Sequence, residues 1–169
     1  MTDLICSKTF LIDSELGELV PIEDFNGSVV NPLYPEGSIQ LDIRGKRFLY
    51  KKEVLDTVEG TWFDLVITSE AIMRDEPSTS CPDPELREIL FVTTPMPAGF
   101  VEFKRVGPDP QRVVVPKVKF IHGILTEVYA VYEELIRILP PRYRGELPQS
   151  DARENQQRIK EYLEELENK

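Results

Sequence analysis

The chain has few residues of the kinds on which most catalytic and metal centres depend. It has one histidine, His122, and two cysteines, Cys6 and Cys81, which follow neither a zinc nor a disulfide spacing. No glycine-rich phosphate-binding motif occurs. A nucleophile would have to use His122 as its base, and Cys6 and Ser150 both lie far from it in sequence. We therefore expect no enzyme activity, no cofactor and no metal.

Long apolar runs and an excess of basic residues are also missing. No window approaches the roughly 18 apolar residues that a membrane span needs, and the start, MTDLICSKTFLID, does not resemble a signal peptide. The 30 acidic residues outnumber the 20 basic ones, so the formal net charge is −10. Nucleic-acid binding needs clustered cations, so we expect none. The two cysteines do not form a disulfide framework and so fit a reducing compartment, which predicts a cytoplasmic protein. The hydropathy and the charge predict that it has neither membrane nor nucleic-acid partners.

Single residues are interpreted by their surroundings. Cys6 stands in an apolar run, which predicts a small core residue, whereas Cys81 lies in a loop of prolines and serines, which predicts an exposed thiol. His122 flanks an apolar helical stripe and is interpreted as a residue without a catalytic role. Trp62, the only tryptophan, is interpreted as a core anchor, with a partly exposed interface residue as the alternative.

Hydrophobic periodicity predicts an α+β fold with an antiparallel sheet. A period of two marks strands, and apolar residues at helical spacing mark helices. The strands are predicted at residues 4–12, 18–22, 38–44, 48–50, 89–93, 100–106 and 112–115, and the helices at 53–74, 119–139 and from 151 onward. Residues 1–37 are expected to form an irregular arm or a pair of short strands. Residues 76–85, which contain three prolines, are expected to form a solvated loop.

The predicted order is hairpin, helix, loop, hairpin, helix, so one hairpin–helix unit lies on each side of the loop. A hairpin and an amphipathic helix cannot each bury an apolar face alone, so we expect these two ββα units to share one core. Residues 1–140 then form a single α+β domain with an irregular N-terminal arm. Residues 141–169 form a linker and a C-terminal amphipathic helix.

The C-terminal helix has a thin apolar side and a predicted cap. Asp151 and Glu154 fit a capping box at its start. Three arrangements remain open: the helix docks on the domain, pairs with a second copy to give a homo-oligomer, or stands free. Its apolar residues are Ile159, Tyr162, Leu163 and Leu166.

Acidic surface residues are the candidates for binding a partner. They fall into two groups, one in the loop that follows the first helix and one at the end of the last helix, and a purely solubilising role is the alternative for both. The candidates are Asp75, Glu76, Asp83 and Glu85 in the loop, and Glu161, Glu164 and Glu165 in the helix.

One segment resembles a known group of proteins. The sequence GSIQLDIRGKRFLYKKEVLDTVEGTWFDLV, followed by a second strand pair and apolar helix, is similar to small bacterial toxin-immunity-type α+β proteins over about residues 37–139. There, a strand pair around a G-x-I-x-L-x-I-x-G-K pattern leads into a helix with a tryptophan. The resemblance implies a protein that neutralises a toxin by binding it. It transfers no site residue, because such proteins bind through variable surfaces.

The leading hypothesis is therefore a non-enzymatic protein-binding module, an immunity or inhibitor protein with a basic toxin or effector as its partner. Complementary charge speeds the association of such a pair and selects the partner. The first alternative is a structural or assembly protein, such as a phage or secretion component, that self-associates through the C-terminal helix. The second alternative is a hydrolase that uses carboxylates alone.

Overall fold

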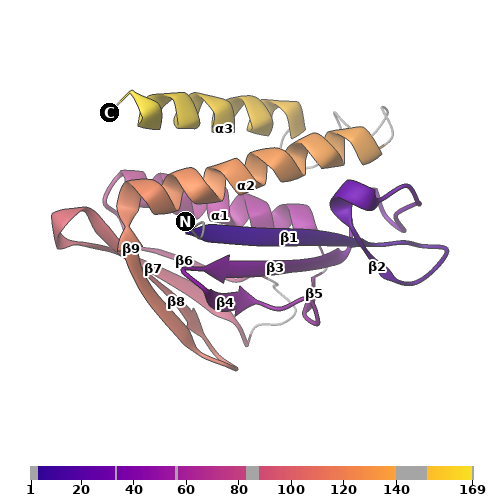
Figure 1. Cartoon of the computed structure of the whole chain (residues 1–169), viewed down its shortest axis with the longest axis horizontal. Coiled ribbons are helices and arrows are strands. Elements are labelled where there is room, and N and C mark those ends of the chain that lie inside the picture. Colours follow the sequence, from indigo (N-terminus) through magenta and orange to yellow (C-terminus); the bar gives the residue numbers. More distant parts are fainter. Residues whose placement is uncertain (1–3, 33, 56, 83–87, 140–151, 169) are drawn as a thin grey trace.

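The molecule is built from antiparallel sheets covered on one side by helices. The computed structural model describes residues 4–32, 34–55, 57–82, 88–139 and 152–168, which contain two sheets and three α-helices (Figure 1). Helices α1 and α2 lie against the sheets, and α3 lies outermost, on α2. The predicted α+β class and antiparallel pairing are confirmed, with the strands divided between two sheets. The equivalence of the two ββα units stays a prediction.

The first sheet has the strand order β2-β1-β3-β4, and β5 also pairs with β3. Of the two expectations for residues 1–37, the pair of strands is realised, and the first of them lies inside the sheet, between β2 and β3. The strands are β1 (Ile5–Ile12), β2 (Leu19–Pro21), β3 (Gly37–Ile43), β4 (Lys46–Leu49) and β5 (Val54–Leu55), and a 3-10 turn, η1 (Ile22–Asp24), follows β2.

The second sheet has the order β6-β7-β8-β9. The prediction of a loop over 76–85 was wrong in part, because Ser78 pairs with Thr93 and Ser80 with Phe91 in a short edge strand. Proline removes the N–H at its own position and restricts the residue before it, and none of Ser78, Thr79 and Ser80 is a proline or directly precedes one. The strands are β6 (Ser78–Ser80), β7 (Leu90–Met96), β8 (Phe100–Val106) and β9 (Gln111–Pro116), and a 3-10 turn, η2 (Pro97–Gly99), joins β7 to β8.

The helices are α1 (Val58–Met73), α2 (Lys117–Ile138) and α3 (Ala152–Glu167). The predicted start of the first helix at residue 53 was wrong. Its first turn is fixed by Thr57, whose Oγ1 accepts a hydrogen bond from the Gly60 N–H at 3.2 Å, while Val54 and Leu55 pair with β3. The second helix lies within two residues of its predicted bounds. The proposed cap at Asp151 lies outside the described residues.

One apolar core is shared by both sheets and the helices. Trp62 of α1 is completely buried in it, and its Nε1–H donates to Thr9 Oγ1 of β1 at 3.1 Å. The interpretation of Trp62 as a core anchor is confirmed. A neighbouring group of aromatic rings, Phe48, Phe91, Phe103 and Phe120, joins β4, β7, β8 and α2, with centroids of contacting rings 5.0–5.4 Å apart.

Neither cysteine is placed as predicted. Cys6 is exposed, because the inward-facing positions of β1 are those of Ile5, Ser7 and Thr9 and the intervening side chains point away. An apolar run of sequence does not reveal which of its alternate positions faces inward. Cys81 is half-buried rather than exposed.

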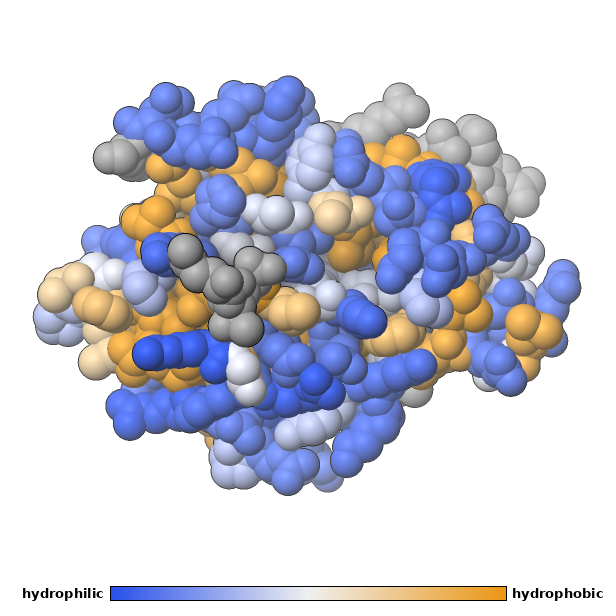
Figure 2. Space-filling view, viewed as in Figure 1, coloured by the Kyte–Doolittle hydropathy of each residue, from blue (hydrophilic) through white to orange (hydrophobic). Residues whose placement is uncertain are grey.

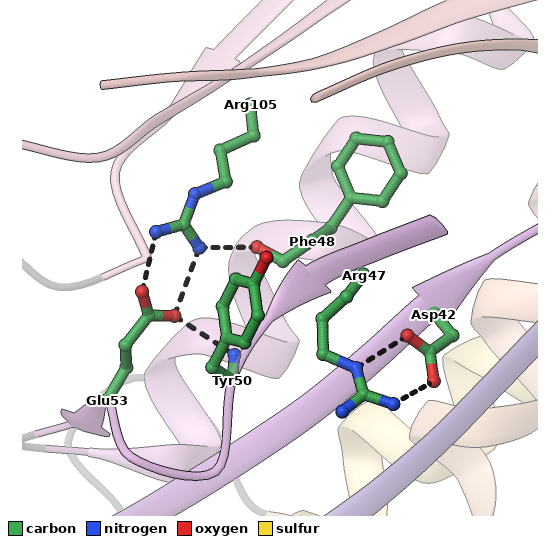
Figure 3. A network of polar contacts seen from close by, with 6 residues as sticks. All are labelled: Asp42, Arg47, Phe48, Tyr50, Glu53 and Arg105. Atoms are coloured by element: carbon green, nitrogen blue, oxygen red, sulfur yellow. Dashed lines mark hydrogen bonds and ion pairs between the residues drawn. The ribbon is translucent and has the colours of Figure 1, made fainter. Parts of the chain in front are cut away.

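A buried ion pair joins the two sheets (Figure 3). The Arg105 side chain of β8 has no exposed surface, and its two terminal nitrogens donate to the two carboxylate oxygens of Glu53 at 2.5 and 3.0 Å. Arg105 also donates to the carbonyls of Phe48 at 2.7 Å and Pro108 at 2.9 Å, and Glu53 accepts from the Tyr50 N–H at 3.0 Å. Because each buried donor and acceptor of the pair has partners, this contact fixes the β4–β5 connection against β8.

Helix α3 docks on its own chain. Ile159 is 1% exposed, and the buried Asn155 donates to the Tyr132 hydroxyl of α2 at 3.3 Å. Arg158 pairs with the buried Glu70 of α1 at 2.5 Å. The apolar side of α3 therefore has a partner within the molecule, so docking on the domain is the one of the three predicted arrangements that the structure contains.

Candidate protein-binding groove

The first half of β1 has one open edge. β2 pairs with β1 only at Phe10 to Ile12, and on that side of residues 5–9 no strand pairs with β1 in the described part of the chain. The other side of β1 pairs with β3 from Ile5 to Leu11. Figure 1 shows β1 along the front of the molecule, between α2 and β3.

The direction of the backbone groups follows from the bonds at the two ends of the strand. The Asp13 N–H bonds to Glu18 on the β2 side, whereas the Ile12 N–H and the Leu4 carbonyl bond toward the β3 side, to Glu36 and Arg44. Alternation along the strand then turns the backbone groups of the odd residues toward the β2 side. The N–H and C=O groups of Ile5, Ser7 and Thr9 therefore point out of the open edge.

A groove runs beside this edge, under α2. Its deeper part near Thr9 is a hollow of about 240 Å³ between β1, η1 and the middle of α2. Helix α2 holds one wall close to the strand, because the Ser7 hydroxyl donates to the Glu127 carboxylate. The lining residues are Ser7, Lys8, Thr9, Ile22, Glu23, Glu127, Ala130, Val131, Glu133 and Glu134.

A second, larger hollow of about 590 Å³ lies beside the start of β1, on the far side of Glu127, which lines both hollows. It is more apolar, with Leu4, Val118 and Leu166 among its lining residues, and His122 at its rim. Gly123 permits the close approach of α2 to β1 here, because an added Cβ would lie 2.5 Å from Ile5 Cγ1. The two hollows lie one after the other along β1 and share Glu127, and together we call them the β1 groove.

The β1 groove is predominantly acidic at its η1 end. Glu23, Glu127, Glu133 and Glu134 line that hollow, and Lys8 is the only cation among its lining residues. Arg137 pairs with Glu134 at 2.6 Å and so neutralises one of the four carboxylates. Figure 2, which shows this face, is mainly hydrophilic with separate apolar areas. The geometry suits a ligand with hydrogen-bonding backbone, positive charge at one end and an apolar group at the other.

The edge of β9, unlike that of β1, is covered by side chains. The Arg112 carbonyl accepts from Lys46 Nζ at 2.8 Å, and the Val114 carbonyl accepts from an Arg44 terminal nitrogen at 3.2 Å. Arg44 lies in the turn between β3 and β4 and Lys46 is the first residue of β4, so side chains of the first sheet cover the edge of the second. Covering an edge in this way protects it from pairing with another chain.

A buried polar cluster lies where the three helices meet. Burial raises the pKa of Glu59 on α1 to about 7, although the hydrogen bond from Tyr132 opposes this shift. Burial and the negative charge of Glu59 raise the pKa of Tyr132 above its usual range. Burial also raises the pKa of Asp64. Glu59 of α1 and Tyr132 of α2 bond to each other, and Asn155 of α3 donates to Tyr132, so this cluster bears on helix packing and stability.

The five predicted acidic residues that the structure describes are not gathered into one site. Asp75 pairs with Lys117 at 2.7 Å and Glu76 with Arg74 at 3.1 Å, all near the carboxyl end of α1 or the start of α2. Asp83 and Glu85 lie outside the described residues. The other three candidates, Glu161, Glu164 and Glu165, lie exposed on α3.

The remaining expectations from the sequence concern His122, a metal site and a membrane span. His122 is exposed on α2, with Glu167 of α3 at 4.0 Å. Across the described residues, no group of three or more His, Cys, Asp or Glu side chains is arranged to hold a metal ion. No helix in that part of the chain is both long enough and apolar enough to cross a membrane.

The residues of the β1 groove were not among the predicted site residues. Residues 4–12 were predicted as a strand, and Glu133 and Glu134 lie within the predicted helix 119–139, but nothing local in the sequence places these two elements together. The one usable signal is the polar stretch Ser7-Lys8-Thr9 within a strand whose other residues are apolar. Comparison with known proteins adds no assignment, because no protein-family model, curated protein or solved structure matches this chain.

Proposed function

We propose that this protein is a non-enzymatic inhibitor that binds a basic protein, a toxin or effector, through the β1 groove. The observation that carries the proposal is the joining of an open strand edge to a hollow lined by four glutamates and one lysine. Backbone groups at an open edge bind protein segments, and the carboxylates select for a basic one.

The charge of the whole chain supports the same proposal. A net charge of −10 attracts a basic partner over distances beyond direct contact. A toxin that acts on nucleic acid has a basic active site, because phosphate binding needs cations. An acidic protein that covers such a surface inhibits by occlusion and needs no catalytic group of its own.

The test is coexpression with the product of the neighbouring gene, followed by binding of the two purified proteins. We expect rescue of growth when the neighbour is toxic, and a complex whose association rate falls at least about tenfold between low salt and about 0.5 M salt. A neighbour that stays toxic in the presence of this protein, together with no binding at low salt, would contradict the proposal.

Charge variants locate the binding surface. The double substitution Glu23→Gln and Glu133→Gln removes two carboxylates from the β1 groove. The matched control, Glu161→Gln and Glu164→Gln, removes two from α3. We expect the groove variant to slow association more than the α3 variant does. The opposite order would place the interface on α3, among the acidic residues singled out from the sequence.

A further inference from the structure

We infer that the partner binds as an added β-strand along the open edge of β1, with a basic side chain over the acidic hollow and an apolar one over the larger hollow. This inference rests on the proposed function, because it specifies how the β1 groove holds its ligand. It goes beyond charge attraction, since it assigns the contact to backbone hydrogen bonds.

The backbone of residues 5–9 is prepared for this pairing. Ile5, Ser7 and Thr9 each present an N–H and a C=O on the side that β2 leaves uncovered. β3 holds the strand in regular antiparallel register on the other side, so the open edge is extended before any ligand arrives. A preordered edge lowers the entropy cost of adding a strand.

The two hollows set the side-chain pattern of the added strand. Both lie on the α2 side of β1, and alternate residues of an added strand point to that side. Thr9 lines the acidic hollow and Ile5 the larger one, four residues apart, or about 14 Å along a strand. A basic and an apolar residue separated by three others in the ligand therefore match the two hollows.

Charge favours a basic segment of another protein over a second copy of this chain. A second copy of this chain carries the same net charge of −10, and like charges oppose association. A basic strand is instead attracted to the carboxylates of Glu23 and Glu133.

The experiment uses the full chain and two synthetic peptides, acetyl-Thr-Lys-Thr-Thr-Thr-Leu-Thr-amide and its reversed sequence, which cover both strand directions. Amide NMR shifts and hydrogen exchange report binding. We expect one peptide to shift and protect the amides of Ile5, Ser7 and Thr9. The control peptides carry Glu in place of Lys, or N-methyl groups on alternate amides, and we expect both changes to weaken binding about tenfold or more.

A matched pair of variants isolates the backbone of the edge. Ser7→Pro removes an N–H that points out of the sheet, which an edge strand tolerates, and Ser7→Ala keeps the N–H while losing the same hydroxyl. We expect Ser7→Pro to bind the peptide about tenfold more weakly than Ser7→Ala. If Ser7→Pro does not fold, the N-methylated peptide provides the same comparison on the ligand side.

The outcomes separate this inference from the proposed function. Peptide binding that ignores N-methylation, or that protects amides elsewhere, overturns strand addition, and so does the absence of binding by either peptide at millimolar concentration. Self-association through the same amides points to a second copy and also overturns it. If the basic partner binds Ser7→Pro and Ser7→Ala equally, strand addition fails while the proposed inhibitor function stands; if no partner binds wild type, the function fails.

Discussion

Arg105 and Glu53 form a two-bonded ion pair that is almost sealed from water. The arginine side chain is fully buried and the glutamate is 14% exposed. Loss of one partner would leave a buried charge without compensation, which is far more costly than loss of an exposed pair. The nearby Arg47 and Asp42 form a more exposed counterpart, with Arg47 Nε 2.7 Å from Asp42 Oδ1 (Figure 3).

The first prediction compares these two pairs. Glu53→Gln should lower the free energy of unfolding by about 3–5 kcal/mol, whereas Asp42→Asn should lower it by about 1 kcal/mol or less. Urea unfolding of both variants measures the difference. Equal effects would show that the buried pair does not hold the two sheets together.

The second prediction concerns pH. The folded-state pKa of Glu59 is about 7 and its ordinary value is 4.5, so the folded state binds the proton more tightly. Stability from this group is present below pH 4.5 and is lost as pH rises toward 7, up to about 3 kcal/mol. Glu59→Gln should therefore stabilise the protein at pH 8 and have little effect at pH 4.5.

Unfolding measured at both pH values tests this, with Glu161→Gln on the exposed surface as the control. The control should change stability by less than about 0.5 kcal/mol at either pH. A Glu59→Gln variant that loses stability equally at both values would mean that the carboxylate is needed as an acceptor for Tyr132 rather than disfavoured by burial.

The third prediction concerns the docking of α3. Ile159→Ala removes a buried side chain at the contact with α2 and should weaken docking by about 2–4 kcal/mol. Because α3 is the last element and packs from outside, its amides should lose hydrogen-exchange protection before those of β3 and β8. Leu163→Ala, at a half-buried position, should have a smaller effect. Equal loss of protection in α3 and the sheets would make α3 part of one cooperative unit.

The fourth prediction concerns thiol reactivity. Cys6 is exposed on β1 and Cys81 is half-buried, so a thiol reagent should modify Cys6 first. Cys6→Ser should remove the fast phase of the reaction and Cys81→Ser should leave it. If Cys81 reacted first, Cys6 would be buried, as the sequence predicted, and the face of β1 that carries Cys6 would point into the core.

Periodicity along the chain predicts which residues form a helix or a strand better than it predicts which elements pair with each other. Alternation identifies Ile39, Leu41 and Ile43 as the inward residues of a strand, and all three are buried. The start of α1 was placed early because Val54 and Leu55 fit both a helix stripe and a strand, and only pairing with Gly37 and Ser38 decides between them. Such pairing depends on residues distant in sequence, which local patterns do not encode.

The candidate site was harder to predict for the same reason. An open edge is a property of strand order, and the order β2-β1-β3 follows from tertiary packing rather than from the composition of β1. In the sequence, nothing distinguishes Glu23 and Glu133 from other acidic residues. They line one hollow only because η1 and α2 both lie near Thr9. The predicted binding residues were instead acidic residues that lie close together in sequence, such as Glu161, Glu164 and Glu165 of α3.

The cover that Arg44 and Lys46 place over β9 has a consequence for stoichiometry. Polymerisation by strand exchange requires each molecule to offer two receptive borders, one to accept and one to extend. Here Arg44 and Lys46 already bond to carbonyls of β9. A filament in which β1 of each molecule pairs with β9 of the next is therefore not expected.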